Sequence, residues 1–410
     1  MAEKTINMGV IGFGNRGHSL VRWCVMPVED VRIVTVCDPS DERIEYAKWR
    51  FNEDKYPMPK FTKDYTDIIN DPEINCVLIA SGWVGHIKIA CEAMRNGKYV
   101  ALEVGGAYSI DDCWKLVRTY EETKMPCMIM ENSCFGRLEM LAYNMHKQGL
   151  FGELVHCQGG YKHNLQKRLA ENVGKPGDYR GADYLHRNCD NYPTHDLGPI
   201  ANLLDINRGN RMLTLTAMAS KAAGIPAYIK ENMPEDPRRG IRIAQGDVTT
   251  TTIKCARGET ITLILDTTLP RPYSRGIQIQ GTKGLVCEDN QSIFLADEAP
   301  EECHHNWSKI WGNIREYYGR YEHPTWVEFN ATGLYKDVKP EYHINVDWLV
   351  FQEFYKAMRA GENTPIDVYD TAAWMAITTL SEDSIAMGGK PVAVPDFTNG
   401  EWMYRQGPMF

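Results

Sequence analysis

The chain has 410 residues, which is more than one ordinary hydrophobic core accommodates, so we expect two domains. Hydrophobic residues make up 43% of the chain and charged residues 24%, a balance typical of globular proteins in water. The formal net charge of −9 argues against nucleic acid or an anionic membrane surface as the main partner. No apolar run approaches the roughly 20 residues that a membrane-spanning helix needs.

The cysteines, the paired histidines and the N-terminus bear on redox state, metals and compartment. The 12 cysteines are scattered without C-x-x-C spacing, which favours reduced thiols in the core over a disulfide framework or a zinc site. His304 and His305 are adjacent and would not face one metal from regular structure, so we predict no metal site. The N-terminus enters a predicted strand with no targeting signal, which predicts a cytoplasmic protein, or a periplasmic one if an export signal was removed.

A glycine-rich turn follows the first predicted strand. Residues 6–11 form a β run that leads into Gly12-Phe13-Gly14-Asn15-Arg16-Gly17 and then into a helical pattern over 18–24. This order of strand, glycine loop and helix is the context of a dinucleotide-binding fingerprint. Gly12, Gly14 and Gly17 permit a tight turn, close approach of a pyrophosphate and close helix–strand packing, and the helix start offers amide donors. Asp38, after the strand 31–37, can hold the ribose hydroxyls of NAD and disfavours the extra phosphate of NADP.

Strands and helices continue to alternate up to about residue 130, which predicts a parallel sheet with helices on both faces. The helical patterns cover 41–51, 81–96 and 111–122, and the apolar strand patterns cover 74–80, 99–103 and 126–130. Ligands of such sheets bind beyond the carboxyl ends of the strands. Side chains just past these ends should therefore surround the nicotinamide, although each alone could be a loop residue or a helix cap. They are Trp83, His86, Glu103, Glu131 and Asn132.

The pattern changes after about residue 135 to longer β segments, with hairpin signals at Arg257-Gly258 and over 281–284, and these predict a mostly antiparallel sheet. The β segments cover 154–163, 213–220, 247–255, 260–268, 276–281 and 284–288. One face of such a sheet can stay open, so a homo-oligomer formed through that face is our hypothesis. The polar segment 164–191 lacks clear periodicity and is predicted to be a substrate-side loop.

The predicted fold class is therefore α/β, with a Rossmann parallel-sheet domain and an α+β domain that carries a large open, mostly antiparallel sheet. The first domain is expected to cover 1–135 and the second 136–345. Amphipathic patterns over 346–360 and 371–387 predict C-terminal helices, and residues 346–410 are expected to return and pack on the first domain.

The stretch from Asn191 to Gly198 puts a tyrosine, a histidine and an aspartate within five residues, before an apolar helical run. Pro193 biases Tyr192 towards an extended conformation, and His195 would lie near the helix start. A Tyr and a His three residues apart can supply proton transfer at a substrate. The alternative is a buried Tyr and a His that caps the helix.

Several ordered motifs make the chain resemble glycoside hydrolase family 109, the NAD-dependent α-N-acetylgalactosaminidase group within the Gfo/Idh/MocA oxidoreductase superfamily. The resemblance runs from about residue 5 to about residue 397. Its motifs are Ser81-Gly82-Trp83-Val84-Gly85-His86, Glu103-Val104, Met130-Glu131-Asn132, Gly149-Leu150-Phe151-Gly152-Glu153, Tyr161-Lys162-His163, Asn191-Tyr192-Pro193-Thr194-His195 and Arg271-Pro272-Tyr273-Ser274-Arg275.

The resemblance implies a glycosidase that uses hydride chemistry on an α-galactosaminide or related hexoside. Bound NAD+ takes a hydride from carbon three of the sugar, and the resulting ketone acidifies the proton on carbon two. A base removes that proton, the aglycone leaves from carbon one, water adds, and the hydride returns. The cofactor is regenerated in each turnover and stays tightly bound. This route differs from the two-carboxylate mechanism of most glycosidases.

The resemblance also implies roles for individual residues. Tyr161 and Tyr192 would contact the sugar, with Tyr161 the candidate base at carbon two. His195 would handle the proton of the carbon-three hydroxyl or of the leaving group, and Glu131 would orient or polarise that network. Tyr273 and Arg180 would bind substrate. The residues that would contact NAD are Asn15, Arg16, Asp38, Trp83, His86, Glu103, Val104 and Asn132.

The chain departs from related patterns at two places. Plain dehydrogenases of the superfamily carry Glu-Lys-Pro where this chain reads Glu103-Val104-Gly105, so their acid–base lysine is missing. Within the glycosidase family, Gly105-Gly106 replaces a bulkier pair. Asp196 follows His195 where the family more often has glycine, and it could reach a sugar hydroxyl or influence His195. The sugar, its anomer, the aglycone and the need for an N-acetyl group therefore stay open.

Two other functions are compatible with the same residues. An NAD-linked sugar or inositol dehydrogenase would consume NAD+ stoichiometrically, whereas the glycosidase would regenerate it. A non-catalytic sugar or NAD sensor on the same fold would not need Glu131, Tyr161, Tyr192 and His195 together.

Overall fold

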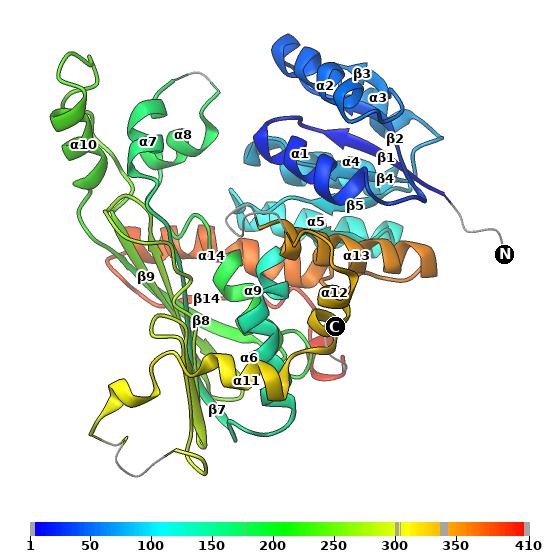
Figure 1. Cartoon of the computed structure of the whole chain (residues 1–410). Coiled ribbons are helices and arrows are strands. Elements are labelled where there is room, and N and C mark those ends of the chain that lie inside the picture. The colour runs from blue at the N-terminus through cyan, green and yellow to red at the C-terminus, as the bar shows by residue number, and fades with distance from the viewer. Residues whose placement is uncertain (1–4, 176, 300–302, 304, 337–342, 406–410) are drawn as a thin grey trace. The chain divides into compact units, whose positions relative to one another are not determined.

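The computed structural model describes residues 5–175, 177–299, 303, 305–336 and 343–405 (Figure 1). These residues form two compact units, each described by itself below. The first unit contains the described residues up to Asn132 together with those between Tyr335 and Ala372. The second contains Ser133–Leu334 and the described residues from Ala373 onward, so the boundary near the C-terminus falls inside one helix.

The first unit is built on a parallel sheet of six strands in the order β3-β2-β1-β4-β5-β6. The strands are β1 Ile6–Ile11, β2 Val31–Cys37, β3 Lys60–Thr62, β4 Cys76–Ile79, β5 Tyr99–Leu102 and β6 Cys127–Ile129. All four residues of β4 are buried, as expected for a strand covered on both faces. The strand order reverses between β1 and β4, and this is the point where open α/β sheets bind ligands.

Helices follow the strands of this sheet in sequence. They are α1 Asn15–Leu20 with a π-helical continuation Val21–Val25, α2 Asp41–Glu53, α3 Thr66–Asn70, the short turn Trp83–Gly85, α4 His86–Arg95, α5 Ile110–Thr123 and, from the C-terminal part, α13 Ile344–Ala360. Serine side chains cap the N-termini of two of these helices. The hydroxyl of Ser40 accepts from the amide of Arg43 in α2, and that of Ser109 accepts from the amide of Asp112 in α5. These caps explain why the helices begin where they do.

The second unit contains an eight-stranded sheet in the order β13-β12-β11-β7-β10-β9-β8-β14. Among the described strands, β7 pairs with β10 in parallel and the other neighbours pair antiparallel. The strands are β7 Leu154–Lys162, β8 Met212–Ala219, β9 Val248–Cys255, β10 Thr260–Asp266, β11 Gln278–Gly281, β12 Gly284–Cys287, β13 Ser292–Leu295 and β14 Val392–Ala393. The predicted fold class, a Rossmann domain plus a large mostly antiparallel sheet, is confirmed.

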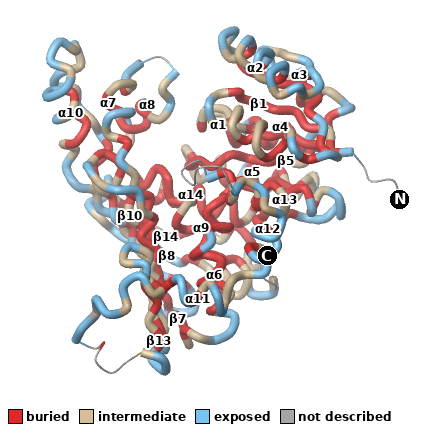
Figure 2. Tube along the Cα trace, viewed as in Figure 1, coloured by how far each residue is buried: buried red, intermediate tan, exposed pale blue. Residues whose placement is uncertain are grey.

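The two faces of the large sheet differ. Residues alternate between buried and more accessible along β9 and β10, reaching exposed in β9 and half-buried in β10, the period-two pattern of a sheet covered on one face. Helices α6 Arg137–Lys147, α9 Thr194–Leu203 and α11 Ile314–Tyr321 lie on the covered side (Figures 1 and 2). Met218, Thr250 and Thr252 are exposed on the other face.

The predicted loop over 164–191 is wrong in part, because two short helices lie inside it. They are α7 Gln166–Asn172 and α8 Tyr179–His186. Each buries only two or three residues, among them Leu169, Ala170 and Tyr184, so the apolar repeat was too short to reveal a period. The sequence patterns also did not show α10 Gly224–Asn232, which contacts α7, or α12 Pro324–Thr332.

Among the described residues, no helix combines the length and the apolar character needed to cross a membrane. His304 lies outside the described residues, whereas His305 is exposed. The last long helix is α14 Val368–Ala386, and short 3-10 turns cover Asn132–Phe135, Trp307–Ile310 and Glu401–Met403.

Gly159 sets the distance between α9 and β7. A Cβ atom at this position would lie 2.7 Å from the Cβ of Asp196. Gly159→Ala should therefore lower the free energy of unfolding by about 1–3 kcal/mol through overpacking. Thermal unfolding followed by calorimetry measures this loss.

The matched control is Gly319→Ala on the exposed side of α11, where an added Cβ would meet no atom within 4 Å. Alanine is the better helix former, so this variant should be neutral or stabilised by up to about 1 kcal/mol. Equal losses in the two variants would contradict the assigned packing of α9 on β7.

Candidate active site

The glycine loop after β1 has two glycines at which a side chain would clash with the backbone, and one glycine that faces open space. Gly12 has φ +97°, and a Cβ there would lie 2.6 Å from the carbonyl oxygen of Ala80. A Cβ at Gly17 would lie 2.1 Å from the carbonyl oxygen of Gly12. At Gly14, which precedes α1, an added Cβ would meet nothing within 4 Å. The loop thus leaves room for a ligand at the start of α1, where backbone amides favour an anion.

Asp38 lies at the carboxyl end of β2 beside this loop. Its Oδ2 accepts from the amide of Phe13 at 2.8 Å, and its Oδ1 accepts from the amide of Ser40 at 3.0 Å. Asn15 lies close by, because its Oδ1 accepts from Arg43 at 3.2 Å. The loop amide therefore fixes the carboxylate, whose remaining lone pairs can accept from a ribose diol. The open place at Gly14 and this carboxylate fit a dinucleotide.

Two residues predicted to contact the cofactor, Arg16 and Asn132, bind an aspartate from the C-terminal part of the same unit, and Arg16 also binds Glu103. Arg16 donates through Nε to Glu103 at 2.8 Å and binds Asp347 of α13 with two hydrogen bonds of 2.6 and 2.8 Å. The side-chain amide of Asn132 also donates to Asp347, at 2.7 Å. The bidentate pair orients the guanidinium. The sequence patterns did not reveal Asp347, whose only signal was an acid in the first turn of an amphipathic helix.

Trp83, His86 and Val104 are buried at the carboxyl ends of β4 and β5. A Cβ at Gly105 would lie 2.7 Å from the indole of Trp83, which explains the glycine after Val104. The imidazole Nε2 of His86 lies 2.9 Å from the carbonyl oxygen of Ser81. Burial lowers the pKa of His86 to about 4, so its ring is neutral at pH 7 and Nε2 donates. Glu131, just past β6, is also fully buried in this unit.

In the second unit, three predicted catalytic rings contact one another. Tyr161 is near the end of β7, and Tyr192 and His195 flank the start of α9. The centroids of Tyr161 and Tyr192 are 4.4 Å apart, and that of His195 lies 5.5 Å from Tyr161 and 4.8 Å from Tyr192, edge-on to both. We call these three residues the ring cluster. It brings together two phenols and an imidazole, the groups needed for acid–base chemistry at a sugar.

A guanidinium lies over the ring cluster. The Cζ of Arg180, from α8, is 4.9 Å from the ring centroid of Tyr192. Burial opposes the charged form of Arg180, but the neighbouring hydroxyls of Tyr161 and Tyr192 raise its pKa above the ordinary value. Arg180 is therefore a permanent cation beside both phenols. A phenolate formed during a reaction would be stabilised by this charge.

Two further rings extend the cluster, and the site prediction omitted one of them. The hydroxyl of Tyr161 lies 3.1 Å from Nδ1 of His163, and the ring of His163 meets Tyr273 edge-on at 5.0 Å. Tyr273 was predicted to bind substrate, whereas His163 appeared only inside the motif Tyr161-Lys162-His163. Its signal was the spacing of two from Tyr161, because alternate residues of an extended segment share a face.

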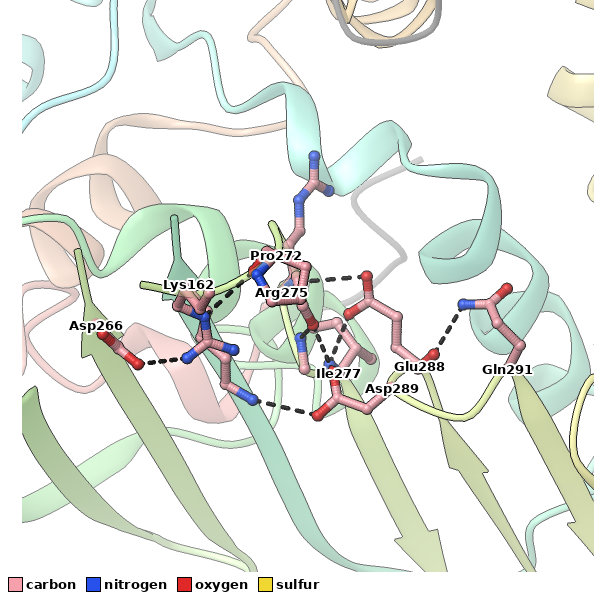
Figure 3. A network of polar contacts seen from close by, with 11 residues as sticks. Lys162, Asp266, Pro272, Arg275, Ile277, Glu288, Asp289 and Gln291 are labelled. Carbon is pink, nitrogen blue, oxygen red and sulfur yellow. Dashed lines mark hydrogen bonds and ion pairs between the residues drawn. The ribbon is translucent and has the colours of Figure 1, made fainter. Parts of the chain in front are cut away.

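Tyr273 is the first residue of the segment 273–277, which runs beside the end of β7 and is held there by hydrogen bonds. The amide of Gly160 donates to the carbonyl of Arg275 at 2.6 Å, and Lys162 exchanges two hydrogen bonds with Ser274. Figure 3 shows the side chains around this segment. The guanidinium of Arg275 donates to Glu139 of α6 at 2.8 Å, and both side chains are buried.

Two acidic side chains complete that network. Glu288 accepts from the amides of Arg275 and Ile277, and Lys162 pairs with Asp289 at 3.5 Å (Figure 3). Burial and the nearby charge of Glu139 raise the pKa of Glu288, while Arg275 opposes the rise. Removal of Arg275 would leave the buried carboxylate of Glu139 without its cation, so the guanidinium fixes the segment that carries Tyr273.

Asp196 lies directly after the ring cluster but is buried against the sheet. Its Cβ packs close to Gly159 of β7, whereas His195 is half-buried and joins the rings. The predicted roles of Asp196 in substrate binding or in influencing His195 stay predictions.

Two family models match the chain. The description "Oxidoreductase family, NAD-binding Rossmann fold" covers residues 6–131, and "Glycosyl hydrolase 109, C-terminal domain" covers 135–404. Scyllo-inositol dehydrogenase from Lactobacillus casei has a similar fold, with a TM-score of 0.68 and 14% identity over 96% of this chain and 99% of that one. A levoglucosan dehydrogenase in complex with NADH and levoglucosan gives a TM-score of 0.67 and 19% identity over 95% and 99%. The chain is thus an NAD-binding protein with the fold of the Gfo/Idh/MocA oxidoreductases.

Curated relatives narrow the class to a family. A glycosyl hydrolase family 109 protein of Parabacteroides distasonis is 36% identical over an alignment of 429 residues, gaps included, that spans 99% of this chain and 89% of the relative. An α-N-acetylgalactosaminidase of Tannerella forsythia is 35% identical over 428 residues, with the same coverage. The chain belongs to glycoside hydrolase family 109, and it is a glycoside hydrolase.

The geometry of the glycine loop predicts different effects of two alanine substitutions. Gly14→Ala should leave the unfolding temperature unchanged, because its methyl group meets open space. That methyl would occupy the approach to the pyrophosphate, so NAD+ should bind about tenfold more weakly, a loss of about 1.4 kcal/mol. Gly17→Ala should instead destabilise the fold. Calorimetric titration with NAD+ and thermal unfolding separate the two effects, and unchanged NAD+ affinity of Gly14→Ala would contradict the assigned approach.

Proposed function

We propose that the chain hydrolyses α-N-acetylgalactosaminides or related hexosides by transient oxidation at carbon three, elimination, addition of water and re-reduction. The observation that carries this proposal is the ring cluster of Tyr161, Tyr192 and His195 under the cation of Arg180, in a chain that also has an NAD-binding loop. The name of the Tannerella forsythia relative supports the substrate class.

The cofactor would be held by the glycine loop, Asp38 and the residues at the carboxyl ends of β4, β5 and β6. When bound, NAD+ supplies a hydride acceptor for carbon three and returns the hydride after hydrolysis, so it would stay bound through each turnover. The open space at Gly14 would admit the pyrophosphate, and Asp38, held by the amide of Phe13, would orient the ribose. Val104 occupies the place of the lysine of plain dehydrogenases and is buried, so this position offers no acid–base group.

Tyr161 would remove the proton on carbon two once carbon three is a ketone. The carbonyl group makes this carbon-bound proton acidic enough for a side-chain oxygen to take. A tyrosine has an ordinary pKa of about 10, so its phenolate needs a nearby cation. Arg180 would supply that charge, since its Cζ lies 4.9 Å from the ring centroid of Tyr192, and that ring contacts Tyr161.

The other rings would handle the exchangeable protons and the sugar. His195 would take the proton of the carbon-three hydroxyl or protonate the leaving oxygen, because its edge faces both phenols. Tyr192 would contact the sugar beside it, and Tyr273 and Asp196 would bind substrate hydroxyls. Glu131 would orient or polarise the network from the NAD-binding unit.

The test measures release of nitrophenol from α- and β-linked aryl hexosides, with and without N-acetyl groups and with and without added NAD+. We expect release without net accumulation of NADH and with deuterium uptake at carbon two in heavy water. Tyr161→Phe should abolish the uptake, and His195→Ala should slow release by about 10²-fold or more. Steady NADH production from a free sugar, without release of nitrophenol from any glycoside, would instead identify a dehydrogenase and contradict the proposed glycosidase activity.

We also propose that the open face of the large sheet pairs with the same face of a second copy. Met218 and Thr250 are neighbours on this face, as are Thr216 and Thr252, and this row of short polar and apolar side chains is only partly buried. A flat face of this kind can form a symmetric interface. Thr250→Arg combined with Thr252→Arg should convert a dimer to a monomer in sedimentation velocity, because two copies would bring like charges together. A monomeric parent protein would rule the interface out.

A further inference from the structure

The hydroxyl of Tyr161 lies against a second histidine, which comes from the same strand rather than from α9. Nδ1 of His163 is 3.1 Å from this hydroxyl, and the two rings meet edge-on at a centroid distance of 5.7 Å. With its proton on Nε2, a neutral imidazole accepts the phenol proton at Nδ1. The candidate base of the ring cluster can therefore donate its hydroxyl hydrogen to His163, a proton acceptor outside the cluster.

We propose that His163 is the positioning partner of Tyr161 and accepts its proton during the step at carbon two. The inference rests on the proposed elimination. As the hydroxyl proton of Tyr161 moves to Nδ1 of His163, the phenolate oxygen takes the proton from carbon two. The electron pair of that carbon–hydrogen bond forms the double bond between carbons one and two, and the bond from carbon one to the aglycone oxygen breaks with its electron pair on oxygen.

The surroundings of His163 keep its imidazole in the form that can accept. Burial lowers its pKa, and the cations of Arg180 and Arg168 and the ring of His195 lower it further. These groups, from α8, the start of α7 and α9, face His163 together with Tyr161 and Tyr273. Since the pKa is below its ordinary value of about 6.5, the ring is neutral at pH 7. Protonation at lower pH would remove the lone pair at Nδ1 and so the acceptor.

Backbone hydrogen bonds hold His163 in place. Its amide donates to the carbonyl of Asp266 at the end of β10, at 2.9 Å, and Tyr273 covers its ring. Tyr161 and His163 are separated by one residue whose side chain, Lys162, pairs with Asp289 away from the rings. The contact between hydroxyl and imidazole is thus fixed by the strand and by the 273–277 segment rather than by a flexible loop.

The experiment follows deuterium exchange at carbon two of a cleavable aryl glycoside by NMR, with the NAD-loaded enzyme in heavy water at several pH values. His163→Asn keeps an amide that can bond the hydroxyl but cannot take up the proton. We expect exchange to slow by about 10²-fold near neutral pH, with KM changed less than kcat. The acid limb of the wild-type profile, with a midpoint below pH 6.5, should also disappear.

His156→Asn is the matched control. His156 is on the same strand, and its Nδ1 also lies close to a hydroxyl, that of Thr260 at 2.9 Å, but it is on the opposite face of β7. This variant should keep the wild-type rate and profile. A rate within twofold of wild type and an unchanged acid limb in His163→Asn would overturn the inference while wild-type exchange still supports the elimination. Glycoside cleavage without any wild-type exchange at carbon two would overturn the elimination itself, and the inference with it.

Discussion

The close approach of α9 to β7 is the contact on which the substrate half of the site depends. Gly159 permits it, since any side chain there would meet Asp196. Tyr161 lies two residues further along the same strand, and Tyr192 and His195 flank the start of the helix. A wider spacing would separate the phenol on the strand from the two rings on the helix. The chemistry proposed for Tyr161, Tyr192 and His195 thus depends on a residue without a side chain at position 159.

Ion pairs orient side chains in both units. The buried Arg275 lies between Glu139 and the segment bearing Tyr273, and the partly exposed Arg16 lies between Glu103 and Asp347. A buried ion pair contributes little net stability, because desolvation offsets most of the attraction, but loss of one partner is costly. Such pairs therefore specify geometry more than they stabilise. In each unit the specified geometry belongs to a residue with a proposed role.

The sequence predicted those features that depend on neighbouring residues. Strand, glycine loop and helix follow one another within 20 residues, and the hairpins at Gly258 and over 281–284 depend on local turn chemistry. Asp347 was missed because it meets Arg16 across 331 residues, which no local pattern encodes. Helices α7 and α8 were missed because each is too short to display a period. His163 could have been predicted from the sequence, because its spacing of two residues from Tyr161 places both side chains on one face of the strand.

The base at carbon two must have an acceptor for its proton as well as a cation. Arg180 stabilises a phenolate but cannot take a proton, because a guanidinium has no acceptor. The imidazoles of His163 and His195 both contact Tyr161, and a neutral imidazole has a ring nitrogen that can accept a proton. A division in which His163 serves the carbon-bound proton and His195 the hydroxyl proton lets both steps occur without one group being needed twice.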